Sequence, residues 1–391
     1  MGGVSTVHDF DLLTVADLRE RGGMNWSTYP DAIGSFVAEM DFDCAPEIIE
    51  ALHAGVDDQR FGYLPPVLVA DMAQACAGWL ADSFAWEVAA TDVRPVGDVI
   101  AAFEIAIEHF SSPGSAVVVP TPAYKHFLDV PLRLGRKVVE VPMVLIEDRW
   151  EHDLDGLDQA FSAGGGLLVL CSPYNPLGRV FSRAELRAVS EVVERHGLGV
   201  FADEIHCPLV LPGASHIPYP TVSPTAAAHT ITALSASKAW NLAGLKCAQV
   251  VLSNDADRET WAGLGIAAEI GTSNPGLIAN AAAYRSAGPW LDEVLSYLDG
   301  NRSRLGELVA QRLPGVVYRP PQGTYLAWLD CTALGIGDRP GDFFAEHAGV
   351  VLTEGADCGD AGRGCVRLNL ATPRPILDEI VNRMASALAR R

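Results

Sequence analysis

The sequence lacks the marks of a secreted, membrane-spanning or metal-stapled protein. Its first residues, MGGVSTVHDFDLLTVADL, contain no basic segment followed by an apolar one, which a secretory signal requires. No apolar run approaches the roughly 20 residues that a membrane helix needs. The eight cysteines are scattered and form no CxxC pair, so they predict neither a zinc site nor a disulfide framework. We therefore expect a cytoplasmic protein with reduced thiols and no bound metal.

Positive charge is also scarce. The 391 residues include 28 Lys and Arg against 49 Asp and Glu, a formal net charge of −21. Nucleic acids and anionic membranes are bound through basic surfaces, so we expect neither as a partner. Apolar residues, in contrast, make up 49% of the chain, which is enough for a large core. Because single cores stop growing at roughly 250 to 300 residues, the length predicts one large and one smaller lobe.

Short β-branched runs alternate with helical patterns between residues 90 and 255. Between two of these runs, Ser182 and Glu185 form a capping-box pattern that predicts the start of a helix. Strand, helix and strand at this spacing indicate an α/β sheet covered on both faces. The runs predicted to be buried strands are Val117–Pro120, Lys137–Val141, Leu167–Cys171, Gly199–Ala202, Thr230–Leu234 and Gln249–Leu252.

The last third of the chain has a different character. A helical stretch, Trp290–Arg312, is followed by two strand-like segments, Gly323–Asp330 and Val366–Asn369, and by a final helix from Pro375. This pattern predicts a separate α+β lobe, which the N-terminal arm is expected to join. The predicted organisation is an arm over residues 1–45, a large domain over residues 46–285 and a small domain over residues 286–391.

Ligands of α/β sheets bind beyond the carboxyl ends of the strands, so polar residues directly after strands are the candidates for a site. The rule selects Asn175, Asp203 and the segment Ser235–Lys238. They belong to the motifs CSPYNPLG (171–178), ADEIH (202–206) and SASKAWNLAGLK (235–246). In these motifs the sequence resembles the aminotransferase class I/II family. The segments VAEMDF (37–42), FGY (61–63) and DEIH (203–206) resemble its MalY/PatB-like cystathionine β-lyase branch.

The resemblance covers essentially the whole chain. It implies the aspartate-aminotransferase fold, with a mostly parallel seven-stranded sheet between helices and a smaller α+β domain. It also implies pyridoxal 5′-phosphate (PLP) as the cofactor, a small amino acid as the substrate and a homodimer with shared active sites.

PLP needs a lysine amine, which binds it as a Schiff base, and a carboxylate that keeps its pyridine nitrogen protonated. By the resemblance, Lys238 is the lysine and Asp203 the carboxylate. Asn175 would donate to the phenolate oxygen of the ring, and His206 stands where many relatives have a tyrosine at the same oxygen. The plain alternatives are a surface lysine, turn residues and a packed histidine. The ordered set of motifs favours the cofactor site.

A phosphate is bound by N–H groups at a helix N-terminus with cations and hydroxyls nearby. Gly97 and Asp98 precede the helical pattern Val99–Phe110 and would form this cradle. Ser235 would add a hydroxyl, and Lys246 a cation in place of the arginine of many relatives. Asp98 departs from the family pattern, because a carboxylate beside a phosphate would repel it. We expect its side chain to point away and only its N–H to contribute.

Four further residues complete the implied site. Tyr63 resembles the tyrosine that reaches the phosphate of the neighbouring subunit, and Tyr124 the aromatic residue that stacks on the pyridine ring. Arg367 would hold the substrate α-carboxylate in a bidentate contact, aided by the backbone of Ala38. The alternatives are a core aromatic for Tyr124 and a surface salt bridge for Arg367.

The reaction is less constrained than the cofactor. In this family the freed lysine, here Lys238, removes the Cα proton, and the outcome is then transamination or elimination of a β-substituent. The segment Gly265–Tyr284, where a dicarboxylate aminotransferase would place its side-chain arginine, contains no Arg or Lys. With the motifs of the branch, this favours β-elimination from a sulfur amino acid, with Tyr63 or Lys238 protonating the departing sulfur. An aminotransferase, an amino-acid cyclase of secondary metabolism and a PLP-containing regulatory protein remain as alternatives.

Overall fold

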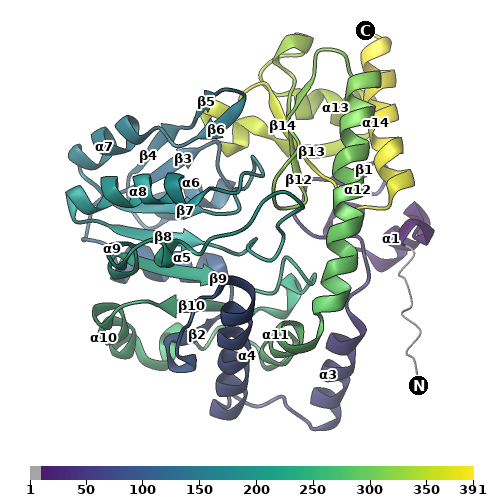
Figure 1. Ribbon diagram of the computed structural model, residues 1–391. Coiled ribbons are helices and arrows are strands. Elements are labelled where there is room, and N and C mark those ends of the chain that lie inside the picture. Colours follow the sequence, from purple (N-terminus) through teal and green to yellow (C-terminus); the bar gives the residue numbers. More distant parts are fainter. Residues whose placement is uncertain (1–9) are drawn as a thin grey trace.

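Two β-sheets organise the computed structural model, which describes residues 10–391 (Figure 1). The larger sheet has seven strands in the order β2-β10-β9-β8-β7-β3-β4. Neighbouring strands are parallel except around β10, which is antiparallel to both β2 and β9. The bounds are β2 Val93–Val96, β3 Ala116–Thr121, β4 Val138–Pro142, β7 Gly165–Cys171, β8 Gly199–Asp203, β9 Thr230–Leu234 and β10 Ala248–Leu252.

The six predicted strands of this sheet are confirmed. Strand β2 was not predicted, because it is only four residues long and contains Pro95. Proline has no N–H group to donate to a neighbour, so it is tolerated only at the edge of a sheet, and β2 is an edge strand. The expected mostly parallel, seven-stranded arrangement is therefore confirmed.

Helices surround the seven-stranded sheet (Figure 1). Helix α8 begins at the predicted capping box: the Ser182 hydroxyl accepts from the Glu185 N–H, and the Glu185 carboxylate accepts from the Ser182 N–H at 2.8 Å. Its C-terminal cap is Gly197 at φ 63°, a conformation that glycine adopts without strain. The helices in this part of the chain are α3 Pro46–Asp57, α4 Pro66–Phe84, α5 Val99–His109, α6 Lys125–Arg133, α7 Leu154–Ser162, α8 Arg183–His196, α9 Pro224–Ala228, α10 Asp255–Leu264 and α11 Asn274–Ser286.

The second sheet has five strands in the order β1-β13-β14-β12-β11. Strand β1 pairs in parallel with β13, so the N-terminal arm contributes a strand to the C-terminal sheet. Residues 1–9 of the predicted arm lie outside the described residues, and the domain boundaries at residues 45 and 285 stay predictions. The bounds are β1 Ile33–Ser35, β11 Val317–Tyr318, β12 Leu326–Asp330, β13 Val350–Glu354 and β14 Cys365–Asn369, with helices α1 Val15–Arg21, α2 Met24–Ser27, α12 Gly288–Arg312, α13 Pro340–Ala348 and α14 Arg374–Ala389, and a hairpin of β5 Val144–Ile146 and β6 Arg149–Glu151.

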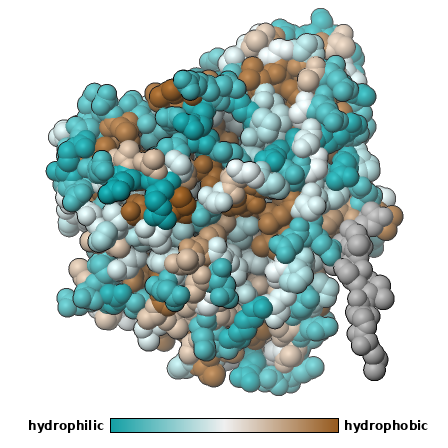
Figure 2. Space-filling view, viewed as in Figure 1, coloured by the Kyte–Doolittle hydropathy of each residue, from teal (hydrophilic) through white to brown (hydrophobic). Residues whose placement is uncertain are grey.

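The buried apolar residues form two clusters. One lies around the seven-stranded sheet and includes Phe103 and Phe201. The other joins the five-stranded sheet to α4, α11 and α12 and includes Trp240 and Leu326. In the view of Figure 2, hydrophilic residues cover much of the outer edges, and several hydrophobic residues are visible between the two sheets. No helix within residues 10–391 combines the length and apolar character needed to cross a bilayer.

Candidate active site

A cavity of about 540 Å³ lies between the seven-stranded sheet, the five-stranded sheet and the N-terminal arm. Its size is that of a small-molecule site. The wall includes ten of the twelve residues predicted to form the site: Ala38, Gly97, Asp98, Tyr124, Asn175, Asp203, His206, Lys238, Lys246 and Arg367. The other two, Tyr63 and Ser235, do not line it.

Strand order explains why these residues meet. Strands β7, β8 and β9 are adjacent and parallel, so their carboxyl ends share one edge of the sheet. Asn175 follows β7, Asp203 ends β8 and Lys238 follows β9. Binding residues at the carboxyl edge are the rule for such sheets. The arrangement that the sequence suggested is therefore present in the fold.

Asp203 is a buried carboxyl, only 5% exposed. Its Oδ1 accepts from the Ile205 N–H at 3.0 Å. Burial raises the pKa of Asp203 to about 7, although this hydrogen bond and the nearby Lys238 ammonium act in the opposite direction. A cation bound next to Asp203, such as a protonated pyridine nitrogen, would favour the ionised carboxylate.

Lys238 points into the cavity from the segment after β9. Its Nζ donates to the Ala38 carbonyl at 2.8 Å. Burial, followed by the positive charge of Arg367, lowers the pKa of Lys238 to about 8. Near pH 7 Lys238 is therefore neutral in a larger fraction of molecules than an ordinary lysine would be. The neutral amine is the form that attacks carbonyl carbons.

Arg367 lies on β14 and reaches the cavity from the five-stranded sheet. Its Nη1 donates to Asn175 Oδ1 at 3.0 Å and its Nη2 to the Phe36 carbonyl at 2.7 Å. Its Nε is buried and has no hydrogen-bond partner. Within residues 10–391 no ion pair joins Arg367 to a carboxylate, and Nε and the second N–H groups of Nη1 and Nη2 remain as donors for a bound anion.

His206 and Asn175 offer further polar atoms to a ligand. The Nδ1 atom of His206 is buried without a partner. Burial, with smaller contributions from Lys238 and Arg367, lowers the pKa of His206 to about 3, so its ring is neutral. Because Asn175 Oδ1 accepts from Arg367, its Nδ2 is left as the donor. The unpartnered buried groups on His206 and Arg367 show that this cavity suits a polar ligand. The carboxyl of Asp203, the amine of Lys238 and the amide of Asn175 fit PLP.

The N-terminus of α5 forms one end of the cavity. A Cβ at Gly97 would lie 2.9 Å from the Gly271 carbonyl oxygen, so only glycine fits there. The Asp98 side chain differs from its expected position, because it does not point away from the cradle. Its Oδ1 caps α5 by accepting from the Ala101 N–H at 2.8 Å, and this places Oδ2 2.8 Å from Lys246 Nζ.

Ser235 lies behind the cavity wall. Its hydroxyl donates to the Cys247 carbonyl at 2.7 Å and accepts from the Ser237 N–H at 3.0 Å. Ser237 lines the cavity and belongs to the selected segment Ser235–Lys238, although no role was predicted for its side chain. The hydroxyl of Ser235 therefore fixes the turn that presents Ser237 and Lys238.

Tyr63 is 94% exposed and stands away from the cavity of its own chain. The turn that carries it is held to the start of α11, where Asn274 Nδ2 donates to the Gly62 carbonyl at 2.9 Å. A contact with a phosphate in the same subunit is therefore absent. A contact with the site of a second subunit remains a prediction.

Tyr325 was missed by the sequence reasoning. Its hydroxyl donates to the Ala38 carbonyl at 3.0 Å, so Tyr325 and Lys238 share one acceptor. Thr324, directly before it, has φ 68°, a strained conformation for a β-branched residue and one that is commonest at functional sites. The segment Gly323–Tyr325 ahead of β12 was visible in the sequence, but nothing in it pointed to Ala38.

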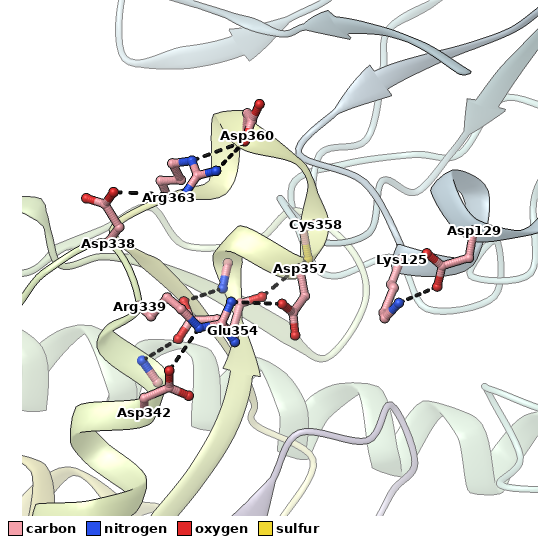
Figure 3. Close-up of polar contacts among 12 residues, drawn as sticks. Lys125, Asp129, Asp338, Arg339, Asp342, Glu354, Asp357, Cys358, Asp360 and Arg363 are labelled. Carbon is pink, nitrogen blue, oxygen red and sulfur yellow. Dashed lines mark hydrogen bonds and ion pairs between the residues drawn. The ribbon is translucent and has the colours of Figure 1, made fainter. Parts of the chain in front are cut away.

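Charged residues at the starts of α6 and α13 and in the loop between β13 and β14 are paired (Figure 3). Arg339 contacts Asp342 at 2.8 Å and Asp357 at 3.1 Å. Lys125, at the start of α6, pairs with Asp129. The Ala123 N–H donates to the Cys358 carbonyl at 2.8 Å, which fastens this loop beside Tyr124. The cations around this loop already have carboxylate partners.

Comparisons with known proteins agree with this geometry. The aminotransferase class I and II family matches residues 36–384. The chain is 36% identical to cystathionine beta-lyase of Corynebacterium glutamicum, over 95% of this chain and 98% of that protein. It is 31% identical to cystathionine beta-lyase PatB of Bacillus subtilis, over 92% and 93%. The crystal structure of a putative PLP-dependent beta-cystathionase from Corynebacterium diphtheriae superposes with a TM-score of 0.91 at 37% identity, covering 96% of this chain and 98% of that one. The chain therefore belongs to the aminotransferase class I and II family.

Proposed function

We propose that this protein is a PLP-dependent carbon–sulfur β-lyase. It converts a sulfur amino acid, such as cystathionine or an S-substituted cysteine, and one molecule of water to a thiol, pyruvate and ammonia. The observation that carries the proposal is the meeting of Lys238, Asp203 and Arg367 around one cavity. Relatives that match nearly the whole chain are named cystathionine beta-lyases, which supports the sulfur substrate.

Each residue has a distinct task. Bound PLP supplies an electron sink that stabilises negative charge at the substrate Cα. Lys238 binds the cofactor and, once freed, takes the Cα proton. Asp203 holds the proton on the pyridine nitrogen, and Asn175 donates to the phenolate oxygen. Arg367 grips the substrate α-carboxylate, with the Ala38 N–H as a further donor.

The charges around the cavity favour a substrate without a second carboxylate. Of the cavity-lining cations, Lys246 is paired with Asp98 and Arg133 with Glu104. Arg285, which directly follows the segment without cations, is paired with Asp71 at 2.6 Å. A side-chain carboxylate of a substrate would have to displace one of these partners. An S-alkyl cysteine has an uncharged thioether and no second carboxylate, so it meets no such cost. Cystathionine carries a second carboxylate at the far end of its side chain, so the charges around the cavity favour the S-alkyl cysteine over cystathionine.

The proposed active form is a homodimer that shares its sites. Tyr63 would act in the cavity of the partner subunit, where it binds the phosphate and can protonate the departing sulfur. Exposed apolar side chains lie near Tyr63 in the sequence, at Phe61, and in the segment before α11, at Ile266 and Ile270. A subunit interface would bury them.

Mixing Tyr63→Phe subunits with Lys238→Ala subunits tests this sharing, because a hybrid dimer has one site with both native residues and should regain activity. If activity does not recover although subunit exchange has been demonstrated, the subunits do not share their active sites.

The activity itself is tested with L-cystathionine and S-methylcysteine. Thiol, pyruvate and ammonia should appear in equal amounts, without any added 2-oxo acid. An aminotransferase would instead stop after one turnover until a 2-oxo acid is supplied, and that result would replace the lyase proposal.

The cofactor lysine is tested by borohydride reduction and peptide mapping. The chain has only four lysines, Lys125, Lys137, Lys238 and Lys246, so the assignment is unambiguous. The reduced cofactor should be found on Lys238 and should be absent from Lys238→Ala, whereas the exposed-site control Lys125→Ala should be labelled like the wild type. Label on any other lysine contradicts the proposed role.

A further inference from the structure

We propose that Asp98 competes with the cofactor phosphate for Lys246 and for the N-terminus of α5, and thereby lowers the affinity of the protein for PLP. The inference rests on the proposed function, since it assumes that the phosphate binds at this end of the cavity. According to this proposal, the Asp98 carboxylate reduces the affinity of the protein for PLP.

Two hydrogen bonds fix the carboxylate in the cradle. Oδ1 accepts from the Ala101 N–H at 2.8 Å, so one of the free donors in the first turn of α5 is already used. Oδ2 lies 2.8 Å from Lys246 Nζ, so the only lysine at this end of the cavity already has an anionic partner. A phosphate needs the same two kinds of group, N–H donors and a cation.

The carboxylate is ionised when the phosphate arrives. Partial burial would raise the pKa of Asp98, but the contacts with Lys246 and the Ala101 N–H outweigh burial and lower it. The backbone of Lys246 is held beside the start of α11, because its carbonyl accepts from the Ser273 N–H at 3.0 Å. The cradle thus offers the phosphate a cation whose charge is already balanced.

Exposure sets the size of the effect. The side chains of Asp98 and Lys246 are 43% and 60% exposed, so solvent weakens the repulsion between carboxylate and phosphate. Two like charges about 5 Å apart in an intermediate dielectric still change a binding constant by about tenfold or more. We therefore expect Asp98→Asn to bind PLP at least tenfold more tightly than the wild type does.

Asp98→Asn is the sharpest variant, because the amide oxygen can still cap α5 while the charge is removed. Its matched control is Asp153→Asn. Asp153 caps α7 in the same way, accepting from the Gly156 N–H at 3.0 Å, but does not line the cavity. Cofactor is removed from all proteins, and the dissociation constants of PLP and of pyridoxal, which lacks the phosphate, are measured by absorbance and fluorescence titration.

The expected result is tighter binding of PLP by Asp98→Asn, with pyridoxal affinity unchanged within twofold and with Asp153→Asn like the wild type. Weaker PLP binding would show that Asp98 instead holds Lys246 ready for the phosphate, and it would overturn the proposal. Equal PLP affinity, or equal gains for PLP and pyridoxal, would also overturn it. If the wild type bound neither compound through Lys238, the proposed function itself would fail.

A double-mutant cycle adds an independent readout. In the wild type Lys246 is balanced by Asp98, so Lys246→Gln should weaken PLP binding only a few-fold. In the Asp98→Asn background the lysine charge is free, and the same substitution should cost at least tenfold. Equal losses in the two backgrounds would contradict the competition.

Discussion

The pH dependence of stability in the cofactor-free protein should report on Asp203. Its pKa is raised from 3.8 to about 7 by burial. Below pH 3.8 the carboxyl is protonated in both the folded and the unfolded chain, so its raised pKa does not reduce the free energy of unfolding. Between pH 3.8 and 7 the unfolded chain ionises while the folded one keeps its proton, so stability falls with rising pH. Above pH 7 the cost is constant.

The size of this cost follows from the two pKa values. At about 1.4 kcal/mol per pH unit, the interval from 3.8 to about 7 corresponds to about 4 kcal/mol at high pH. Between pH 5 and pH 8 this cost increases by about 2.5 kcal/mol, so the free energy of unfolding falls by the same amount. Asp203→Asn has no titrating group at this position, so the stability difference between variant and wild type should grow by that amount.

The assay is urea denaturation of both cofactor-free proteins at pH 5 and pH 8, at one protein concentration. Repeating it in a Lys238→Met background is informative, because the Lys238 ammonium lowers the pKa of Asp203. Without that ammonium the growth between pH 5 and pH 8 should be larger. A stability difference that is the same at both pH values would refute the buried, proton-binding carboxyl.

Three further predictions concern the cavity. The rate at which cofactor-free protein captures PLP should rise with pH, reach half its maximum near pH 8 and level off above that pH, because the neutral amine of Lys238 is the reactive form; a midpoint near that of an ordinary lysine in stopped-flow absorbance would contradict its lowered pKa. Arg367→Lys should weaken substrate binding about tenfold or more and leave PLP affinity unchanged, since a point charge cannot replace two parallel hydrogen bonds worth roughly 1.5 to 3 kcal/mol each; unchanged substrate affinity in a spectral titration would remove Arg367 from this role. Tyr325→Phe should lower PLP affinity about tenfold, because the Ala38 carbonyl loses its second donor when Lys238 turns to the cofactor; equal affinity would show that the shared acceptor has no effect.

The sequence alone determined most of the fold. Runs such as Leu167–Cys171 and Thr230–Leu234 are β-branched or apolar throughout, and such runs are stable only as strands covered on both faces. The capping box at Ser182 predicted the start of α8 for a local reason, since its hydrogen bonds join residues three apart. Lys238, Asp203 and Asn175 were selected by their positions after strands, because the carboxyl edge of a parallel sheet is where ligands bind.

The tertiary structure alone decided which side chains share an acceptor or compensate a charge. Arg367 meets Asn175 across 192 residues and Lys238 meets Ala38 across 200, through contacts that exist only after both sheets and the arm have packed. The same holds for Asp98, whose cap on α5 is local but whose partner Lys246 is 148 residues away. Local propensity constrains a backbone over a few residues, whereas the partner of a buried polar group is set by the packing of distant segments. For this reason the sequence predicted ten of the residues that line the cavity but missed Tyr325, the position of Ser235 behind the wall and the orientation of Asp98.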